Sequence, residues 1–320
     1  RSRRQHGGHL RLCRTNERGG VMRNPYKIDG PAHISFSGGR TSAYMLHQIL
    51  DAYDGKLPED IPVVFANTGK ERPETLEFIH RCATEWGVNI HWLEWKAGVP
   101  GKTSVVDYET ASRTGGPFAA FIKHSKSLPN SIRRSCTGHM KIKIIEWYLR
   151  KFLGMGDFDS VVGLRADEMH RVTRIRARQN GVGGDIYCPL ADAKKTARDV
   201  QKFWDNNSFD LNLINVNGRS PHGNCDLCFL KGVRILEGLI RENPESADWW
   251  IEQEEAMLPI VAESLEKRFG NMKGTTYFAQ FRTEETYRQL RDRVLAQGDL
   301  LSLDNVGEEV DWGKPCHCTD

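Results

Sequence analysis

The sequence contains no apolar run that approaches the roughly 18 residues needed for a membrane-spanning helix. No secretory leader is expected, because nothing in the sequence resembles a basic start followed by an apolar centre and a small-residue cleavage site. The net charge of +3 is too small to indicate a partner by itself. With 39% hydrophobic and 27% charged residues, the chain is expected to be a globular cytoplasmic protein with no membrane partner.

Strand-like and helix-like segments alternate over the first part of the chain. The pattern predicts strands at 32–36, 61–65, 88–93 and 160–164, and helices at 43–50, 73–79 and 139–152. This alternation predicts an α/β fold of Rossmann-like type, a doubly wound and mostly parallel sheet with helices on both faces. Residues 97–130 are predicted to be a loop-rich insertion or a lid. From 243 to 297 the pattern predicts a helical C-terminal region.

A short glycine turn separates the first predicted strand from the first helix. It runs from Ser35 through Ser37-Gly38-Gly39-Arg40-Thr41-Ser42. Glycines allow the backbone to approach a phosphate closely, and free amides at the helix start bind the anion. The turn matches neither G-x-G-x-x-G nor the Walker pattern ending in Gly-Lys-Ser/Thr. A phosphate site is therefore predicted from the strand before it and the helix after it, with a plain loop as the alternative.

Several motifs resemble one known family, in the same order along the chain. They are Phe36–Ser42, Val63–Gly69 with Arg72–Thr75, Cys136 with Lys141, Gly163–Glu168, and Pro189-Leu190 with Asp199-Val200. The first resembles the PP-loop of the adenine nucleotide alpha-hydrolase-like superfamily, and the whole set resembles the phosphoadenosine phosphosulfate reductase family. The resemblance implies a PP-loop fold that binds ATP or a related adenine nucleotide with Mg²⁺.

The sequence also departs from the family's pattern. Usual PP-loops carry Asp where this chain has Thr41, and the reductases carry Asp at Asn67 and a second cysteine at Thr137. The Glu-Cys-Gly-x-His motif that bears the reductases' catalytic thiol does not occur, although Cys316-His317-Cys318 lies at a comparable end. The Asn224–Phe229 segment resembles phage and prophage members. These departures argue against simple sulfonucleotide reduction.

The motifs divide the chain into three predicted parts. Residues 1–24 form a basic extension that is expected to be disordered, either a nucleic-acid arm or an upstream addition ahead of Met22. Its arginines, set against the single acid Glu17, are Arg1, Arg3, Arg4, Arg11, Arg14, Arg18 and Arg23. Residues 25–235 form the PP-loop nucleotide-binding domain with its cysteines, and residues 236–320 form the helical C-terminal region and tail.

The resemblance and the positions after strand ends give a set of candidate site residues. Those expected to bind the nucleotide are Ser35, Ser37, Gly38, Gly39, Arg40, Thr41, Ser42, Asn67, Thr68, Gly69, Gly163 and Arg165. Those expected to support catalysis by charge are Arg40, Lys141, Arg165 and Glu168. For Arg165 and Glu168, a surface salt-bridge cluster is the alternative interpretation.

Eight cysteines in a cytoplasmic chain do not indicate a disulfide framework, so their clustering points to metal or redox chemistry. Cys225-x-x-Cys228 supplies half of a metal site. Cys136 and Cys188 are the predicted partners, with Cys316 and Cys318 as rivals. Analogy with cluster-bearing relatives favours [4Fe–4S]; structural zinc and metal-free thiols are the alternatives.

Three functions remain open at this stage. The first is an ATP pyrophosphatase that adenylylates an acceptor, with sulfur transfer from a donor assisted by the cluster. The second is a sulfonucleotide reductase that uses a thiol of the C-terminal tail as its nucleophile. The third is a non-enzymatic phage regulatory protein that binds nucleotide and, through its arginine-rich segments, nucleic acid. The oligomeric state is left open.

Overall fold

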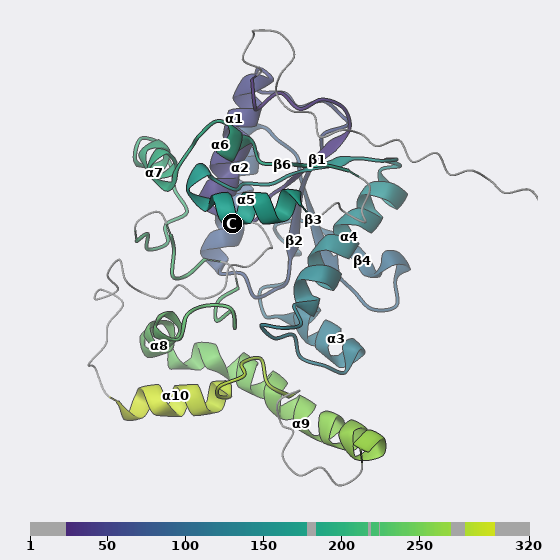
Figure 1. The fold of residues 1–320 in the computed structure, drawn as a ribbon, viewed down its shortest axis with the longest axis vertical. Coiled ribbons are helices and arrows are strands. Elements are labelled where there is room, and N and C mark those ends of the chain that lie inside the picture. The colour runs from purple at the N-terminus through teal and green to yellow at the C-terminus, as the bar shows by residue number, and fades with distance from the viewer. Residues whose placement is uncertain (1–23, 178–183, 217–218, 224, 270–278, 298–320) are drawn as a thin grey trace, which may run out of the picture.

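The computed structural model describes residues 24–177, 184–216, 219–223, 225–269 and 279–297. Within them, one six-stranded sheet has the order β4-β3-β2-β1-β5-β6 (Figure 1). The strands are β1 (Ala32–Ser35), β2 (Val63–Asn67), β3 (Ile90–Trp95), β4 (Thr103–Val106), β5 (Asp159–Val161) and β6 (Ile186–Tyr187). All neighbours are parallel except β3 and β4. The predicted doubly wound, mostly parallel sheet is confirmed.

Helices cover the sheet and continue beyond it. They are α1 (Arg40–Ala52), α2 (Pro73–Trp86), α3 (Gly116–Ser125), α4 (Lys143–Trp147), α5 (Met169–Arg176), α6 (Pro189–Asp192), α7 (Ala197–Asp205), α8 (Val233–Glu242), α9 (Asp248–Phe269) and α10 (Tyr287–Ala296). Short 3-10 helices are η1 (Pro100–Lys102), η4 (Ala166–Glu168) and η5 (Pro244–Ala247), and π-helical segments are η2 (Thr137–Ile142) and η3 (Tyr148–Phe152). The segments η2, α4 and η3 follow one another without a break, which confirms the helix predicted at 139–152.

The strand order creates a switch point beside β1. Ile34 of β1 is in register with Val63 of β2 on one side and with Val161 of β5 on the other. The chain therefore builds the sheet outward from β1 in both directions. In open α/β sheets, ligands bind at the carboxyl ends of the strands on either side of such a point.

Two hydrophobic clusters lie on the two faces of the sheet. Along β2, Val63 and Phe65 pack into the cluster formed with α1 and α2, whereas Val64 and Ala66 pack into the other. This alternation follows from the two-residue side-chain period of a strand. Because both faces are covered, β2 consists entirely of buried residues.

The C-terminal helices share the second cluster with the sheet. Val64 and Phe118 belong to the same cluster as Trp250, Phe281 and Tyr287. Figure 1 shows α8, α9 and α10 beyond the carboxyl ends of the strands, at the far end from the last turn of α1. The boundary predicted at 235/236 falls inside α8, because the apolar face of that helix is continuous with the core beneath the sheet.

Residues 97–130 differ from the loop-rich insertion or lid that their glycines predict. They contain η1, the antiparallel edge strand β4 and the helix α3. The pairing of Leu93 with Val105 shows why, since the segment completes the β3 edge of the sheet. The extension predicted at 1–24 lies outside the described residues except for Asn24. In the described part of the chain, none of the helices has the length and apolar character to cross a membrane.

Gly115 offers a test of how the C-terminal helices contact the sheet domain. Its φ is +81°, and an added Cβ would lie 2.6 Å from Nε1 of Trp249 and 2.8 Å from Cδ of Lys70. Gly30 has the same φ of +81° but nothing within 4 Å. Gly30→Ala is therefore expected to cost only backbone strain, about 1 kcal/mol. Gly115→Ala is expected to lower the free energy of unfolding by a further 1 to 3 kcal/mol or so, through overpacking.

Urea unfolding of both variants measures this difference. Equal losses in the two proteins would show that the helices can move away from Gly115 at no cost, contrary to a packed contact between Trp249 and the sheet domain.

Candidate functional site

The turn between β1 and α1 is held against α2 by a glycine. Gly38 has a φ of +81°, and an added Cβ would lie 2.7 Å from both Thr75 Cγ2 and Ile79 Cδ1. A side chain is therefore excluded by conformation and by space at once. This close contact fixes the distance between the turn and α2.

Two serines close the turn on itself. The hydroxyls of Ser37 and Ser42 lie 2.9 Å apart, and Ser42 Oγ accepts from the Ser37 amide at 3.3 Å. Ser42 Oγ also donates to the carbonyl of Gly39 at 2.9 Å. These bonds join the end of β1 to the first turn of α1, so the loop has a defined shape before any ligand binds.

The start of α1 is left open to an anion. Gly39 is its N-cap residue, and no side chain caps the first turn. A Cβ added at Gly39 would have open space around it, with Ser37 Oγ at 3.6 Å as its neighbour. Free amides at a helix start, together with the helix dipole, bind phosphate groups. This part of the predicted site has the geometry that the sequence motif requires.

Arg40 has a different surrounding from the one predicted. Its Nε donates to Asp210 Oδ1 at 2.6 Å, its Nη2 pairs with the other oxygen of that carboxylate, and Nη2 also donates to the Leu213 carbonyl at 2.8 Å. Burial alone would raise the pKa of Asp210, but the hydrogen bonds and charge of Arg40 lower it below its usual range. The guanidinium thus fastens the segment around Asp210 to α1, and its charge is already paired.

Arg165 connects the segment after β5 to the start of α1, across the switch point. It follows β5, is 4% exposed, and donates from Nη1 to Thr41 Oγ1 of α1 at 2.9 Å. Its Nε donates to Asp167 Oδ1 at 3.0 Å, and its Nη2 lies 3.5 Å from Glu168 Oε2. Glu168 is also buried and pairs with Arg171. The carboxylates of Asp167 and Glu168 therefore hold the Arg165 guanidinium beside the phosphate turn.

Asn67 and Gly69 shape the turn after β2. Asn67 Nδ2 donates to Glu94 Oε1 at 2.6 Å and to the Ser112 carbonyl at 2.9 Å, and its Oδ1 accepts from the Gly69 amide at 3.0 Å. Glu94 is buried, and burial raises the pKa of its carboxyl even though hydrogen bonds from Ser112 and Asn67 act against this. An amide at position 67 suits this neighbour because it can donate, whereas an aspartate cannot.

The next residues connect this turn to a lysine and a cysteine. Glu71 Oε2 accepts from the Thr68 amide at 2.8 Å, and Glu71 Oε1 lies 3.9 Å from Lys141 Nζ. Thr68 Oγ1 lies 3.5 Å from Cys225 Sγ. Glu71, which is not among the predicted site residues, therefore contacts both Thr68 and Lys141.

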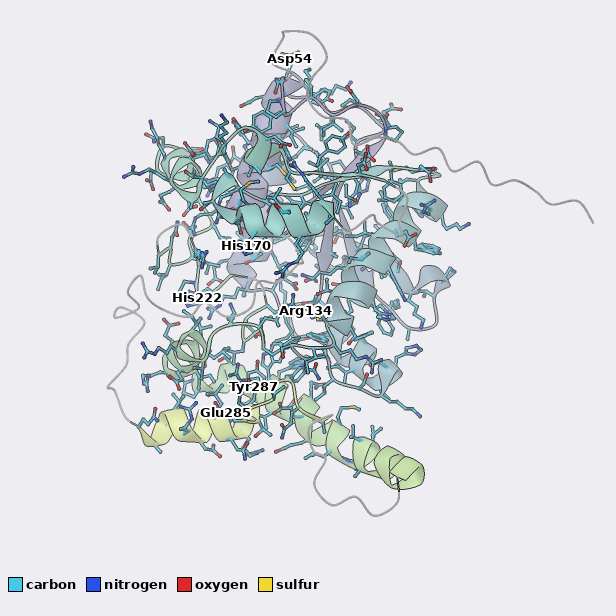
Figure 2. The ribbon with its side chains drawn as sticks, viewed as in Figure 1. Asp54, Arg134, His170, His222, Glu285 and Tyr287 are labelled. Carbon is cyan, nitrogen blue, oxygen red and sulfur yellow. The ribbon has the colours of Figure 1, made fainter. Side chains whose placement is uncertain are left out.

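A second ladder of contacts ties the same turn to the C-terminal region. Glu71 and Cys225 form an isolated antiparallel bridge, and the Asp226 amide donates to the Lys70 carbonyl at 2.8 Å. The Lys70 and Asp226 side chains form an ion pair of 2.7 Å, and Trp250 Nε1 donates to Asp226 at 2.9 Å. In Figure 2, Arg134 lies between the sheet and these helices, while Asp54 lies at the opposite end of the molecule.

The structure does not assemble the predicted metal ligands Cys136, Cys188, Cys225 and Cys228. Within the described residues, no three His, Cys, Asp or Glu side chains are grouped so that they could hold a metal. Cys188 packs in a separate cluster with Val162, and burial raises the pKa of its thiol to about 11 despite the nearby charge of Arg176.

The pKa of the Cys225 thiol is also raised, by burial and by Glu71. Within the described residues the four predicted cysteines form no metal-holding group, and the rivals Cys316 and Cys318 lie outside these residues.

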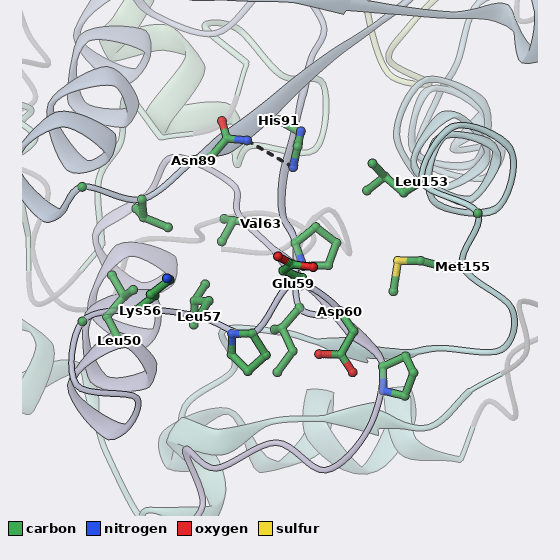
Figure 3. A pocket seen from close by; sticks show the side chains of 18 of the residues that line it. Leu50, Lys56, Leu57, Glu59, Asp60, Val63, Asn89, His91, Leu153 and Met155 are labelled. Carbon is green, nitrogen blue, oxygen red and sulfur yellow. Dashed lines mark hydrogen bonds between the residues drawn. The ribbon is translucent and has the colours of Figure 1, made fainter.

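A cavity of about 650 Å³ lies at the opposite end of the strands from the phosphate turn (Figure 3). Its lining includes Pro31, Asp60 and Asn89, which precede β1, β2 and β3. Asn89 Nδ2 and His91 Nε2 are 3.4 Å apart there. Because these residues lie at the amino ends of the strands, the cavity is separate from the phosphate turn.

Three site residues are not among the predicted ones, two of them because their partners are distant in sequence. Asp210 lies 170 positions from Arg40, and Glu94 lies 27 positions from Asn67. An acidic residue inside the apolar strand β3 is the only sequence signal for Glu94. Glu71 follows the Thr-Gly-Lys turn directly, so a carboxylate beside the predicted loop was the available signal there.

Taken together, the open parallel sheet, its switch point and the uncapped helix start define an α/β protein of the class that binds phosphate-bearing ligands at the carboxyl edge. Comparison with protein families gives a more specific assignment. The phosphoadenosine phosphosulfate reductase domain matches residues 31–214, and the chain belongs to that family.

Two further comparisons give more distant similarity. The chain is 28% identical over 211 residues to the uncharacterized nin region protein ORF290 of Escherichia phage lambda, which covers 63% of this chain and 67% of that protein. A crystal structure of phosphoadenylyl-sulfate reductase from Candida auris, in a phosphate complex, is 18% identical. It has a TM-score of 0.37 and covers 57% of this chain and 75% of the other.

Replacing Asn67 by Asp tests the fit to Glu94. Two carboxylates would then face each other where a hydrogen bond of 2.6 Å now lies. We expect the variant to lose about 1 to 3 kcal/mol at neutral pH. The pair's pKa in the folded state would be raised above its unfolded value, so the loss grows as the pH rises through that folded pKa and shrinks in acid.

Unfolding free energies between acid and neutral pH measure this dependence. Asn67→Asp combined with Glu94→Gln restores one donor facing one acceptor, and should recover part of the loss. A deficit that does not change with pH would contradict the proposed carboxylate repulsion.

The two glycines of the turn provide a matched pair. Gly38→Ala is expected to destabilise the fold by about 2 kcal/mol or more, because strain and overpacking combine. Gly39 has an ordinary φ of −91° and open space around it. Gly39→Ala should therefore lower the free energy of unfolding by only about 1 kcal/mol or less. We nevertheless expect Gly39→Ala to weaken nucleotide binding about tenfold, since its methyl group would stand where a phosphate approaches.

Calorimetric titration with ATP and thermal unfolding separate the two effects. Unchanged ATP affinity in Gly39→Ala would contradict the assignment of this turn as the phosphate site.

Proposed function

We propose that the chain binds ATP with its phosphates at the start of α1 and cleaves it between the α- and β-phosphates. An acceptor oxygen attacks the α-phosphorus, the bond to the bridging oxygen breaks, and pyrophosphate leaves with those electrons. The acceptor then carries AMP. Membership of an adenine-nucleotide-binding family supports the ligand, and the acceptor reaction is the step we add.

The observation that carries the proposal is the uncapped first turn of α1 next to Gly39. Its amides can bind phosphate oxygens before and during the reaction without moving. Preorganised donors of this kind stabilise developing charge at little reorganisation cost. Mg²⁺ fits the same role as a counter-ion of the polyphosphate, although we assign no protein ligand to it.

Arg165 is the residue best placed to assist. It already donates to Thr41, so a small movement of its guanidinium would let it donate to a phosphate at the same turn. Asp167 and Glu168 hold it there, which makes Glu168 a positioning residue rather than a catalytic one. Lys141 is another cation of the predicted catalytic set, and its contact with Glu71 places it near the turn after β2. Arg40 is assigned to structure because Asp210 and Leu213 occupy it.

A second candidate is a sulfonucleotide reductase, and the family match favours it. In that reaction a tail thiolate would attack the sulfur of the nucleotide and release the nucleotide phosphate. The nucleophile would be Cys316 or Cys318. The sulfur transfer that the predicted cluster would support is not part of the proposal, because the described residues do not form a cluster site.

The two candidates separate in one experiment. Purified protein is incubated with ATP and Mg²⁺, and separately with phosphoadenylyl sulfate and a dithiol, while pyrophosphate and sulfite are measured. The proposal expects pyrophosphate release that persists when residues 314–320 are deleted. It also expects Arg165→Gln to lower that rate about a hundredfold or more, as loss of a preorganised charge contact does.

Sulfite release that disappears with the tail deletion, without pyrophosphate from ATP, would establish the second candidate and overturn the first. ATP binding without either product would leave only a nucleotide-binding protein, and would also overturn the proposed activity.

A further inference from the structure

One stretch of the chain is free of acidic residues. Between Glu109 and Glu146 there is no Asp or Glu, while seven Lys and Arg and two His occur. The basic residues are Arg113, Lys123, Lys126, Arg133, Arg134, Lys141 and Lys143, with His124 and His139. The stretch is therefore strongly basic in a chain whose net charge is only +3.

The fold gathers part of this stretch around His139. The pKa of His139 is lowered by burial and then by the positive charges of Lys143, Lys102, Arg133 and His124. These five groups, which we call the His139 patch, come from η1, α3, the loop before η2, η2 itself and α4. Residues far apart in the sequence thus share one positive surface.

Contacts within the fold fix the arrangement of the patch. Lys102 Nζ lies 2.6 Å from His124 Nε2, so these two side chains are in direct contact. A ladder of rings continues from His124 to Trp95 at 5.4 Å, from Trp95 to Phe121 at 5.6 Å and from Phe121 to His139 at 5.7 Å. Trp95 and Phe121 are buried. His124 and His139 are therefore joined through a buried aromatic pair.

The five side chains are exposed. None of the ion pairs found among the described residues includes Lys102, Arg133 or Lys143. Glu146, the acid nearest in sequence, lies 3.5 Å from Arg150 instead. An exposed cluster of one sign, without carboxylates to balance it, keeps a strong positive potential.

The patch lies beside the candidate site. Figure 1 shows α3, α4 and β4 on the same side of the molecule. Lys141 belongs to η2 together with His139, and its Nζ lies 3.9 Å from Glu71 of the turn after β2. Ile142 and Ile132, which are 47% and 75% exposed, add apolar surface to the same segment. The positive surface thus begins next to the turn after β2 and extends away from it.

We propose that the His139 patch binds the phosphate backbone of a single-stranded nucleic acid. Evenly spaced phosphates suit several cations spread over one face, and the exposed isoleucines offer a surface to unstacked bases. An isolated anion would need a buried, convergent site, whereas these cations are exposed and spread. The proposal does not depend on ATP cleavage, because no member of the patch is assigned to the phosphate turn.

The experiment uses the full chain and a fluorescent DNA strand of about 20 nucleotides, with an RNA strand of the same sequence, over roughly 50 to 300 mM salt. The test variant combines Lys102→Gln, Arg133→Gln and Lys143→Gln. The matched control combines Lys56→Gln, Arg198→Gln and Lys202→Gln, three exposed cations elsewhere. Thermal unfolding and ATP binding are measured for both variants.

The test variant is expected to bind the strand at least about tenfold more weakly, with the slope of log K against log salt reduced by about 2. The control should change the affinity less than about twofold, as expected for charges outside the contact. Equal weakening by both variants would overturn the proposal, because it would reflect net charge alone.

Binding to vesicles of anionic lipid, without binding to either strand, would also overturn it. Gly39→Ala should keep full strand binding, so a failure of the patch and a failure of the phosphate turn are seen in different variants.

Discussion

The contact of Gly38 with α2 is the constraint on which the proposed site depends. Because Thr75 and Ile79 lie where a side chain would stand, the turn after β1 is held at one height above its neighbour helix. Ser37 and Ser42 then close the turn, and the amides of α1 point out of it without an internal acceptor from a capping side chain. An anion-binding geometry is present in the fold itself and does not have to be formed by the ligand.

The departures from the family pattern become intelligible through long-range neighbours. At Asn67 an amide faces the buried Glu94, so the change from Asp removes a like-charge contact. At Thr41 a hydroxyl accepts from Arg165, whose charge is already paired with Asp167 and Glu168. Neither substitution by itself indicates loss of nucleotide binding. Each is matched to a partner that the family motif does not include.

The sequence predicted what depends on local pattern and missed what depends on distant contacts. The alternation of strands and helices gave the sheet, and the glycine turn gave the position of an open helix start. The contact of Arg40 with Asp210, 170 positions away, is one that no local pattern indicates. The cysteine set rested on the Cys-x-x-Cys spacing and on the family resemblance, but Cys188 packs in a separate cluster with Val162. Periodicity carries no information about such pairings, which are decided when the elements pack.

The ladder between Lys70–Glu71 and Cys225–Asp226 has a consequence for how the molecule responds to a ligand. The turn after β2 is joined to α9 through Asp226 and Trp250. A ligand that displaces the turn after β2 would therefore pull on α9 through the Lys70–Asp226 ion pair, the backbone hydrogen bond from Asp226 to Lys70 and the hydrogen bond from Trp250.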